Sequence, residues 1–418
     1  MEVDAIPQQA QEKIQEISSA DLVIGVLADF DRDGIAMLCD GLRGLGGSPR
    51  IALLQNDHAG TPTPTATDAD KSQKSTSPFL VPWPLLRPDS SGAPLLNLFE
   101  AYQSVYVASE KLRARACCIV ASKLEAATPQ WVSQLARPLL EGDFDLVAPR
   151  YGRHKFEGLL NGSVISPMTR CLYGKRIHNP MGPDLGVSQR LFQKMLLATA
   201  PGARARGLHP LVSLAPAALC DNMQVCEVHV GARIYPPTDW TKISSLVAQL
   251  LSPVFLDMER NAACWQRMRS STPVPTMGAP TFVSQDTGNL DINRMVESFQ
   301  LGNRDLQEIW SLVLPPSTLF ELKKLSRLPV EQFHMPNELW VRIIYDFALA
   351  HRLRTISRDH LLKSMTPLYL AWVASYARDI AAGGAVAVEQ TFERLSVAYE
   401  ASKSYLVSRW RWPDRFNP

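Results

Sequence analysis

Four cations lie close together in the motif Arg150-Tyr-Gly-Arg153-His154-Lys155, and they could bind an anion. Arginine presents a rigid fork of donors that matches the two oxygens of a carboxylate or a phosphate. The alternative is a basic turn that is merely solvated. The motif directly follows a predicted strand, and open parallel sheets bind their ligands at the carboxyl ends of strands. We therefore expect an anion site here.

Carboxylates occur in three motifs. Asp29-Phe-Asp31-Arg-Asp33-Gly34, with Asp40 beyond it, is close to a calcium-loop pattern, but it follows an apolar strand instead of a helix and ends on Asp instead of Glu. Asp68-Ala-Asp70 has no strand before it that could hold a metal pair rigidly. We expect neither to bind a metal. The third motif is Asn179-Pro-Met-Gly182-Pro-Asp184-Leu-Gly186. It is either a tight turn or a carboxylate held near a substrate hydroxyl, and its composition favours neither interpretation over the other.

Short apolar runs separated by helical patterns predict a parallel sheet. The expected strands are residues 21–27, 50–54, 116–120, 145–148 and 224–234. Runs of this kind fit strands that are buried on both faces. Helices are expected at residues 3–18, 34–45, 95–113 and 128–141. This order of elements predicts an α/β fold.

The second half of the chain reads as helical. A long helix is expected over residues 240–268, interrupted at Pro253, and a proline-rich linker over 270–289. Residues 60–78 have low complexity and lack large apolar groups, which predicts a flexible loop. The expected domains are an N-terminal helix (1–20), an α/β domain (21–238), a long helix with a linker (239–290) and a helical C-terminal region (291–418).

Bulk composition excludes several classes of partner. The chain has 418 residues, 43 basic and 41 acidic, with a formal net charge of +2, so nothing favours nucleic acid or a membrane surface. No apolar run approaches the roughly 20 residues that span a bilayer. The N-terminus lacks the basic-then-apolar order of a signal peptide. Seven cysteines without Cys-x-x-Cys spacing predict free thiols and a cytoplasmic location.

Residues 117–131 carry the most information about function. A short apolar strand ends at Val120, the polar segment Ala121-Ser122-Lys123 follows, and Thr128-Pro129 opens a helix. A polar segment between a buried strand and a helix is where α/β proteins place ligand-binding groups.

Several blocks, in this order, resemble the GT-A fold glycosyltransferases close to mannosylglycerate synthase and glucosyl-3-phosphoglycerate synthase. The resemblance covers about residues 21–412. Its most specific blocks are Arg150-Tyr-Gly-Arg-His-Lys-Phe-Glu-Gly, Pro167-Met-Thr-Arg-Cys-Leu-Tyr-Gly-Lys-Arg176, Pro180-Met-Gly-Pro-Asp-Leu-Gly186 and Asp359-His-Leu-Leu-Lys-Ser-Met-Thr-Pro-Leu-Tyr369. It implies the nucleotide-diphospho-sugar transferase fold, a mixed sheet flanked by helices. It also implies transfer of a sugar from a UDP- or GDP-linked donor to a small acidic acceptor of the glycerate or phosphoglycerate type.

The resemblance also assigns roles to individual residues. Asp57 would face the nucleotide base, and Ser122 and Lys123 would contact the donor. Lys123 and Asp184 are the expected catalytic residues. The expected acceptor contacts are Arg153, His154, Lys155, Gly182 and His209. Pro183 replaces the second Gly of a Gly-Gly-acid motif, which removes a backbone N–H and stiffens the turn.

The departures from the family pattern concern the metal. The family's Asp-x-Asp becomes Ala121-Ser122-Lys123, a metal-ligating His becomes Tyr235, and a Gly-Ile-Asp-like element becomes Gly207-Leu208-His209. No hard divalent ion would then have adequate ligands, so we expect no metal and no cofactor.

Two hypotheses follow. The chain is a hexosyltransferase in which the Lys123 ammonium offsets the diphosphate charge, or it is an inactive homologue that binds a nucleotide sugar or pairs with an active partner. The sequence leaves open whether the chain forms a homodimer through the helical region.

Overall fold

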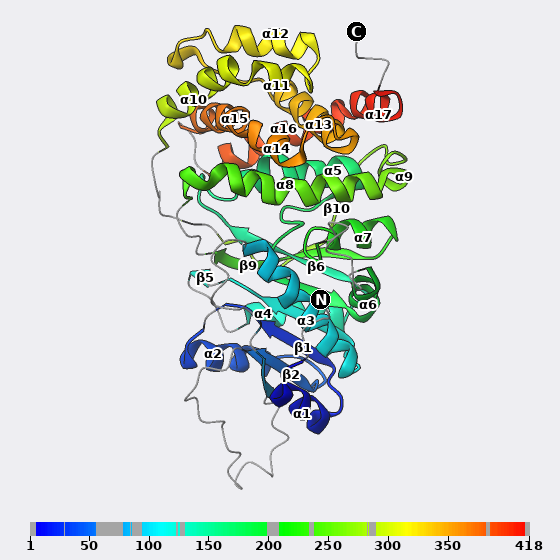
Figure 1. Ribbon diagram of the computed structural model, residues 1–418. Helices are drawn as coiled ribbons and strands as arrows, with labels where there is room; N and C mark the ends of the chain where they lie inside the picture. Colours follow the sequence, from blue (N-terminus) through cyan, green and yellow to red (C-terminus); the bar gives the residue numbers. More distant parts are fainter. Residues whose placement is uncertain are drawn as a thin grey trace. The chain divides into compact units, whose positions relative to one another are not determined.

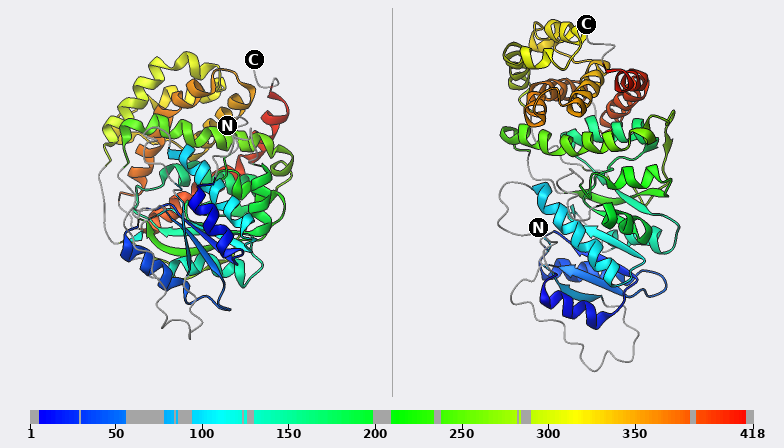
Figure 2. Two further views of the ribbon diagram at one scale, coloured as in Figure 1. Left: turned by 60° about the horizontal axis from the view of Figure 1, so that its bottom comes forward. Right: turned by 45° about the vertical axis from the view of Figure 1, so that its right-hand side comes forward.

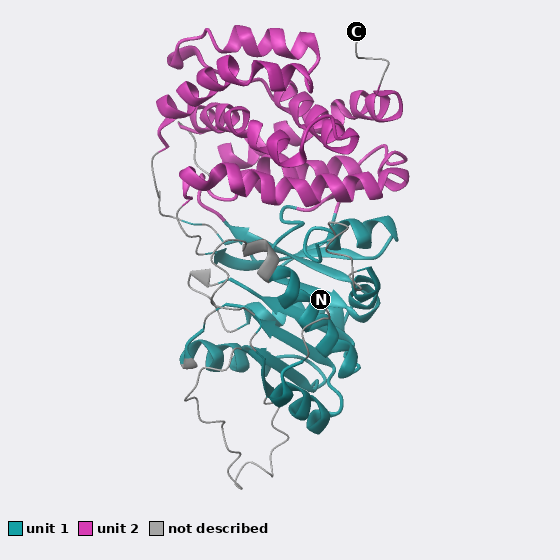
Figure 3. Cartoon of the chain, viewed as in Figure 1, with its two compact units in different colours: residues 1–152, 178–234, 274–283 teal, residues 153–177, 235–273, 284–418 magenta. Residues whose placement is uncertain are grey.

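The computed structural model describes residues 6–28, 30–55, 78–83, 85, 94–122, 124–125, 130–198, 209–233, 238–281, 283, 290–381 and 385–413. The chain forms two compact units, each assembled from separate stretches of sequence (Figure 3). The first comprises residues 1–152, 178–234 and 274–283. The second comprises residues 153–177, 235–273 and 284–418. Residues 153–177 thus leave the first unit and belong to the helical one.

The first unit is built on a mixed sheet (Figure 1). Its strands are β1 (Leu22–Val26), β2 (Ile51–Gln55), β3 (Phe79–Pro82), β4 (Ala116–Val120), β5 (Leu124–Glu125), β6 (Leu146–Gly152), β8 (Leu185–Ser188), β9 (Val225–Arg233) and β11 (Thr276–Met277). Eight strands follow the order β11-β9-β6-β8-β4-β1-β2-β3, and β5 pairs with β9. β8 is antiparallel to β4 and β6, and β5 is antiparallel to β9. The other pairs are parallel. The expected mixed sheet is confirmed.

Helices cover both faces of this sheet, which explains why β1 and β4 are apolar throughout. The helices of this unit are α1 (Gln8–Ile17), α2 (Arg32–Leu42), α3 (Pro94–Lys111), α4 (Trp131–Leu140), α6 (Gln189–Ala198) and α7 (Leu214–Cys220). Side chains of α2 and α4 share one apolar cluster with Leu22, Ile24 and Val26 of β1. On the opposite face, a Cβ at Gly25 would lie 2.2 Å from a methyl of Val105 in α3, so β1 and α3 are in close contact. Burial on both faces is what such apolar strands require.

The second unit is helical (Figure 2). It contains a π-helix, η2 (Asn161–Ile165), two 3₁₀ turns, η3 (Trp240–Lys242) and η4 (Val330–Gln332), and a small parallel pair, β7 (Lys175–Arg176) with β10 (Thr272–Pro273). Its α-helices are α5 (Ser166–Tyr173), α8 (Ile243–Arg260), α9 (Ala262–Trp265), α10 (Ile292–Asp305), α11 (Gln307–Ser311), α12 (Pro316–Leu325), α13 (Asn337–Leu353), α14 (Arg358–Ser364), α15 (Thr366–Asp379), α16 (Ala385–Ala401) and α17 (Lys403–Arg411).

The π-helix joins residues 153–177 to the later helices. The carbonyl of Ser163 accepts hydrogen bonds from the Trp340 indole at 3.2 Å and from the Tyr399 hydroxyl at 2.9 Å. Pro167, four positions after Ser163, has no N–H to donate to this carbonyl, and the two side chains satisfy it. The carbonyl of Lys155 accepts from Tyr376 at 2.6 Å.

Two expectations about the middle of the chain were wrong. Pro253 does not interrupt α8, which runs to Arg260. The break falls at Asn261, whose side chain caps the helix by donating to the Asp257 carbonyl at 3.0 Å. The stretch 270–289 is not wholly a linker, because β10 and β11 lie in it and pair with β7 and β9.

The remaining expectations have mixed outcomes. Residues 60–77 of the expected flexible loop lie outside the described residues. All seven cysteines are free thiols. In the part of the chain that the structure describes, no helix is long and apolar enough to cross a membrane.

Candidate functional site

The order of the strands creates a candidate ligand site between β1 and β4. From β1 the chain continues to β2 and β3 on one side of β1 and then returns as β4 on its other side. The two strand ends are tied together, since the amide of Leu27 donates to the carbonyl of Val120 at 2.7 Å. In open α/β sheets, ligands bind outside the carboxyl ends of the strands at such a switch point. The segments after Val26 and Val120 are therefore the first candidates.

The segment after β4 is held by a carboxylate. The amides of Ala121 and Ser122 donate to Oδ1 of Asp184 at 2.7 and 2.9 Å. Ser122 is only 3% exposed, and its hydroxyl has no hydrogen-bond partner among the described residues. Buried hydroxyl groups normally find a partner, so this one is a candidate contact for a ligand or a water molecule.

Asp184 reaches this segment because β8 runs against its neighbours. It directly precedes β8, so it lies at the edge where β4 and β6 end. Asp184 is fully buried. Its Oδ2 accepts from the Tyr151 hydroxyl at 2.5 Å, and its own amide donates back to that hydroxyl oxygen at 3.3 Å. The carboxylate thus accepts from Ala121, Ser122 and Tyr151.

A β-bulge in the pairing of β6 with β9 lies immediately before Tyr151. The pairing of β6 with β9 shifts between Arg150 and Tyr151, where β9 has one residue more than β6. Tyr151 pairs with Gly231, whose φ of 109° favours glycine. The guanidinium of Arg233, the last residue of β9, lies 5.8 Å from the centre of the Tyr151 ring. This interaction places a cation close to the Tyr151 side chain that binds Asp184.

The loop before Asp184 is fixed at three further points. The side-chain Nδ2 of Asn179 donates to the Pro149 carbonyl at 2.9 Å. A Cβ on Gly182 would lie 2.2 Å from Cγ of Pro149, so only glycine fits there. The Tyr102 hydroxyl donates to the carbonyl of Pro183 at 2.8 Å. Burial, and then the charge of Asp184, raise the pKa of Tyr102 well above its usual value, which keeps this donor protonated.

The same loop begins with a histidine and glutamate pair. The amide of His178 donates to Oε1 of Glu227 at 2.6 Å, and its Nδ1 lies 2.8 Å from Oε2. Glu227 is 1% exposed. Both oxygens of this buried carboxylate are therefore engaged by one residue of the loop.

The basic motif that follows β6 belongs to the second unit from Arg153 onward. A Cβ on Gly158, whose φ is 61°, would lie 3.2 Å from Nη1 of Arg153, so the guanidinium packs over this glycine. The amide of His154 donates to the Glu157 carboxylate at 3.1 Å. The ammonium of Lys155 lies 5.1 Å from the centre of the Phe156 ring. These three side chains share one short segment.

The sequence-derived site is thus brought together in part. Ser122, Gly182 and Asp184 lie at one edge of the sheet. His209 is buried in the same unit, with its ring 6.1 Å from that of Phe99 and its Nδ1 accepting from the amide of Leu211 at 3.2 Å. The positions that lie outside the described residues are Asp57, Lys123, Gly207, Leu208 and Tyr235.

Sequence reasoning missed Tyr151, Tyr102 and Arg233. No described group of three or more His, Cys, Asp or Glu side chains could hold a metal ion. In the motif that is close to a calcium-loop pattern, Asp31 caps α2 by accepting from the amide of Gly34 at 2.9 Å, whereas Asp29 lies outside the described residues. The pair Asp68 and Asp70 also lies outside.

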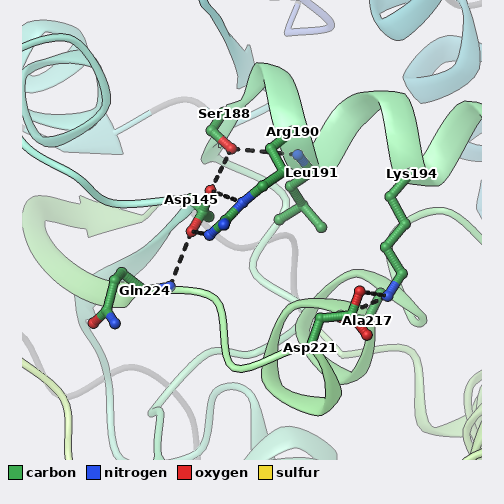
Figure 4. A network of polar contacts seen from close by, with 8 residues as sticks. All are labelled: Asp145, Ser188, Arg190, Leu191, Lys194, Ala217, Asp221 and Gln224. Carbon is green, nitrogen blue, oxygen red and sulfur yellow. Dashed lines mark hydrogen bonds and ion pairs between the residues drawn. The ribbon is translucent and has the colours of Figure 1, made fainter.

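At the opposite edge of the sheet, a second carboxylate ties strands together (Figure 4). Asp145 accepts from Ser188 at 2.8 Å, from the amide of Gln224 at 3.0 Å, and from Arg190 at 3.1 and 2.5 Å. Burial alone would raise the pKa of Asp145, but these hydrogen bonds outweigh it and hold the pKa below its usual value. Lys194 pairs with Asp221 nearby. These polar groups satisfy one another through hydrogen bonds and ion pairs, so we assign them a role in the stability of the first unit.

No protein-family model matches this sequence, and no curated protein matches it. Solved structures do show similarity. Glucosyl-3-phosphoglycerate synthase from Mycobacterium tuberculosis, in complex with Mg²⁺ and uridine diphosphate, is 14% identical with a TM-score of 0.35, covering 60% of this chain and 83% of that one. The same enzyme with Mn²⁺, uridine diphosphate and glucosyl-3-phosphoglycerate is 16% identical with a TM-score of 0.35, covering 61% and 84%.

Mannosyl-3-phosphoglycerate synthase from Rubrobacter xylanophilus is 12% identical with a TM-score of 0.34, covering 64% of this chain and 82% of that one. These enzymes are of the class that the sequence resembles. With identities and TM-scores this low, they do not fix the activity, substrate or partners of this chain.

Proposed function

We propose that this chain binds a nucleotide sugar at the switch point between β1 and β4 and transfers the sugar to a small acidic acceptor without a divalent metal. The observation that carries the proposal is the buried Ser122 hydroxyl, which has no partner among the described residues although it lies directly after β4. A buried polar group without a described protein partner, at the carboxyl end of a strand beside a switch point, is suited to contact a ligand.

The proposed reaction is a group transfer. The bond between the anomeric carbon and the diphosphate oxygen breaks, a bond to an acceptor hydroxyl oxygen forms, and the hydroxyl proton is released. The departing diphosphate needs positive charge, and we assign this role to Lys123, as the sequence resemblance suggests. Asp57 would bind the base. The side chains of Arg153, His154 and Lys155 would bind the acceptor's carboxylate or phosphate, for which arginine is well shaped.

We revise the role of one residue within this proposal. Asp184 accepts hydrogen bonds from Ala121, Ser122 and Tyr151 and is fully buried. A carboxylate so engaged is suited to holding the segment after β4 in place. We therefore propose Asp184 as a positioning residue, and leave Lys123 as the proposed catalytic group. A cytoplasmic location agrees with this function and stays a proposal, as does a homodimer.

The proposal is tested by incubating the full chain with UDP- and GDP-sugars and glycerate or 3-phosphoglycerate, with EDTA or with manganese. We expect turnover that is insensitive to EDTA and lost in Lys123→Ala. Lys111→Ala is the matched control, because Lys111 is exposed at the end of α3. Turnover only with manganese would refute the metal-free mechanism.

Two further outcomes bear on function. Binding of a nucleotide sugar without transfer to any acceptor would favour the alternative of an inactive, ligand-binding homologue. Absence of binding to every donor would refute the proposal as a whole.

A further inference from the structure

We infer that Ser122 recognises a neutral hydroxyl group of the donor's sugar and not its diphosphate. The inference rests on the proposed function, because it concerns which part of the same ligand lies against the segment after β4. It makes Ser122 a specificity-determining residue with a defined chemical preference.

Two main-chain donors of the described part of the segment after β4, which could otherwise bind a phosphate, are already used. Consecutive amides that point the same way form anion-binding concavities in many proteins. In this chain the amides of Ala121 and Ser122 both point at Oδ1 of Asp184, at 2.7 and 2.9 Å. The protein thus fills its own anion site with a side chain.

The Asp184 carboxylate, which occupies these two amides, also disfavours a second anion beside them. All three groups that contact the Asp184 carboxylate donate to it, and an ionised carboxylate only accepts. The group is fully buried, where charges are screened far less than in water. Oδ1 lies 2.9 Å from the amide nitrogen of Ser122, so a phosphate against this residue would meet like charge at short range.

Tyr151 keeps the carboxylate in this arrangement. Its hydroxyl donates to Oδ2 at 2.5 Å and accepts from the amide of Asp184 at 3.3 Å. Both oxygens are therefore fixed, and Asp184 cannot turn away from the amides of Ala121 and Ser122 without breaking these bonds. The negative charge beside Ser122 is built into the site.

The Ser122 hydroxyl is the group left for a ligand. A serine hydroxyl donates one hydrogen bond and accepts others, which complements a sugar hydroxyl that does the same. It is 3% exposed and lacks a partner among the described residues, so an uncharged hydroxyl would satisfy it without adding charge near Asp184. Anion binding then falls to other groups, a role proposed above for Lys123 from the sequence resemblance.

The test compares two nucleotide sugars, each with the nucleoside diphosphate that lacks the sugar and has one more ionisable oxygen. Dissociation constants are measured by calorimetry for UDP-glucose and UDP, and for GDP-mannose and GDP, with the full chain and with Ser122→Ala. Loss of one neutral hydrogen bond should weaken nucleotide-sugar binding about fivefold to tenfold. Binding of the free diphosphate should change by less than about twofold.

Two variants serve as controls. Ser122→Thr keeps a hydroxyl and should retain the preference for the sugar-bearing ligand. Ser109→Ala removes another fully buried hydroxyl, which donates to the carbonyl of Val105 at 2.7 Å, and should leave the ratio of the two constants unchanged.

The outcomes separate this inference from the proposed function. Equal weakening of both ligands by Ser122→Ala, or greater weakening of the diphosphate, overturns the inference while nucleotide-sugar binding by the unaltered chain still stands. Failure of the unaltered chain to bind any nucleotide sugar overturns both.

Discussion

Tyr151 and Asp184 exchange two hydrogen bonds, one from the phenol to Oδ2 at 2.5 Å and one from the Asp184 amide back to the phenol oxygen at 3.3 Å. Tyr151 lies in β6, Asp184 directly precedes β8, and Oδ1 reaches the two residues after β4. Since β6, β8 and β4 are neighbours in the sheet, one carboxylate joins three strands at the edge where we place the ligand.

We expect Asp184→Asn to destabilise the sheet unit without changing side-chain volume. An amide replaces one acceptor oxygen by a donor, which would then face an N–H or O–H donor. The free energy of unfolding should fall by about 1–3 kcal/mol for this unpaired buried group. Amide exchange at Ala121 and Ser122 should become faster in native conditions, because their acceptor is weakened.

Tyr106→Phe is the matched control for this prediction. Tyr106 is fully buried and its hydroxyl has no partner among the described residues, so its removal breaks no described hydrogen bond and should not lower the free energy of unfolding. Unchanged exchange at Ala121 and Ser122 in Asp184→Asn would contradict the prediction.

The sequence predicted the parts of this arrangement that depend on local pattern. The runs over β1, β2, β4 and β6 are largely apolar because both faces of the sheet are covered, and such runs can be recognised in a sequence. The change from the apolar strand ending at Val120 to a polar segment also predicted that Ser122 directly follows a strand. Helix α8 shows the limit, since a proline at position 253 suggested a break that the structure places at Asn261.

Contacts between residues far apart in sequence could not be predicted in this way. Tyr151 and Asp184 are separated by 33 positions and meet through β8, a four-residue strand too short to show a period. Cys171 and Tyr345 are 174 positions apart and lie 3.2 Å from each other in the helical unit. The roles of Asp57 and Lys123 stay predictions, because both lie outside the described residues.

We expect Gly182→Ala to be strongly destabilising. The new Cβ would lie 2.2 Å from Cγ and 2.7 Å from Cδ of Pro149, and a proline ring cannot rotate away. Overpacking of this kind typically costs about 1–3 kcal/mol. Thermal unfolding of the variant measures the loss.

A second substitution tests the cause. Pro149→Ala removes the two ring atoms that clash, so the double variant Gly182→Ala/Pro149→Ala should recover part of the stability lost in Gly182→Ala. Additive losses in the double variant would show that Pro149 is not the reason for glycine at this position.

We expect the two glutamates that bind Arg170 to contribute unequally to the helical unit. Arg170 is 7% exposed and lies 2.6 Å from Glu393 and 2.8 Å from Glu400. Glu393 is 55% exposed and Glu400 only 28%. Glu393→Gln should therefore cost less than about 1 kcal/mol, as exposed pairs do. Arg170→Gln should cost more than either glutamate change, because it breaks both pairs.

Tryptophan fluorescence during urea unfolding checks this order, because seven of the nine tryptophans lie in the second unit. A larger loss for Glu393→Gln than for Glu400→Gln would contradict it.

We expect Asp145 to make stability depend on pH in the acid range. Hydrogen bonds from Arg190, Ser188 and Gln224 overcome the effect of burial and lower the pKa of Asp145 in the folded chain. A lowered pKa means that the contribution is complete above the unfolded carboxyl value of about 3.9. It is lost as pH falls through the lower folded value.

The substitution Asp145→Asn isolates this effect. At pH 7 it should lower the free energy of unfolding by about 1.5–3 kcal/mol, the usual worth of hydrogen bonds to a charged group. The difference from the unaltered chain should shrink below about pH 4, where Asp145 takes up a proton in the unfolded chain first and in the folded chain only at lower pH. Asp143→Asn is the control, because Asp143 is exposed two positions earlier. A difference between Asp145→Asn and the unaltered chain that stays constant from pH 7 to pH 2 would show that charge at Asp145 is not what ties β6, β8 and β9 together.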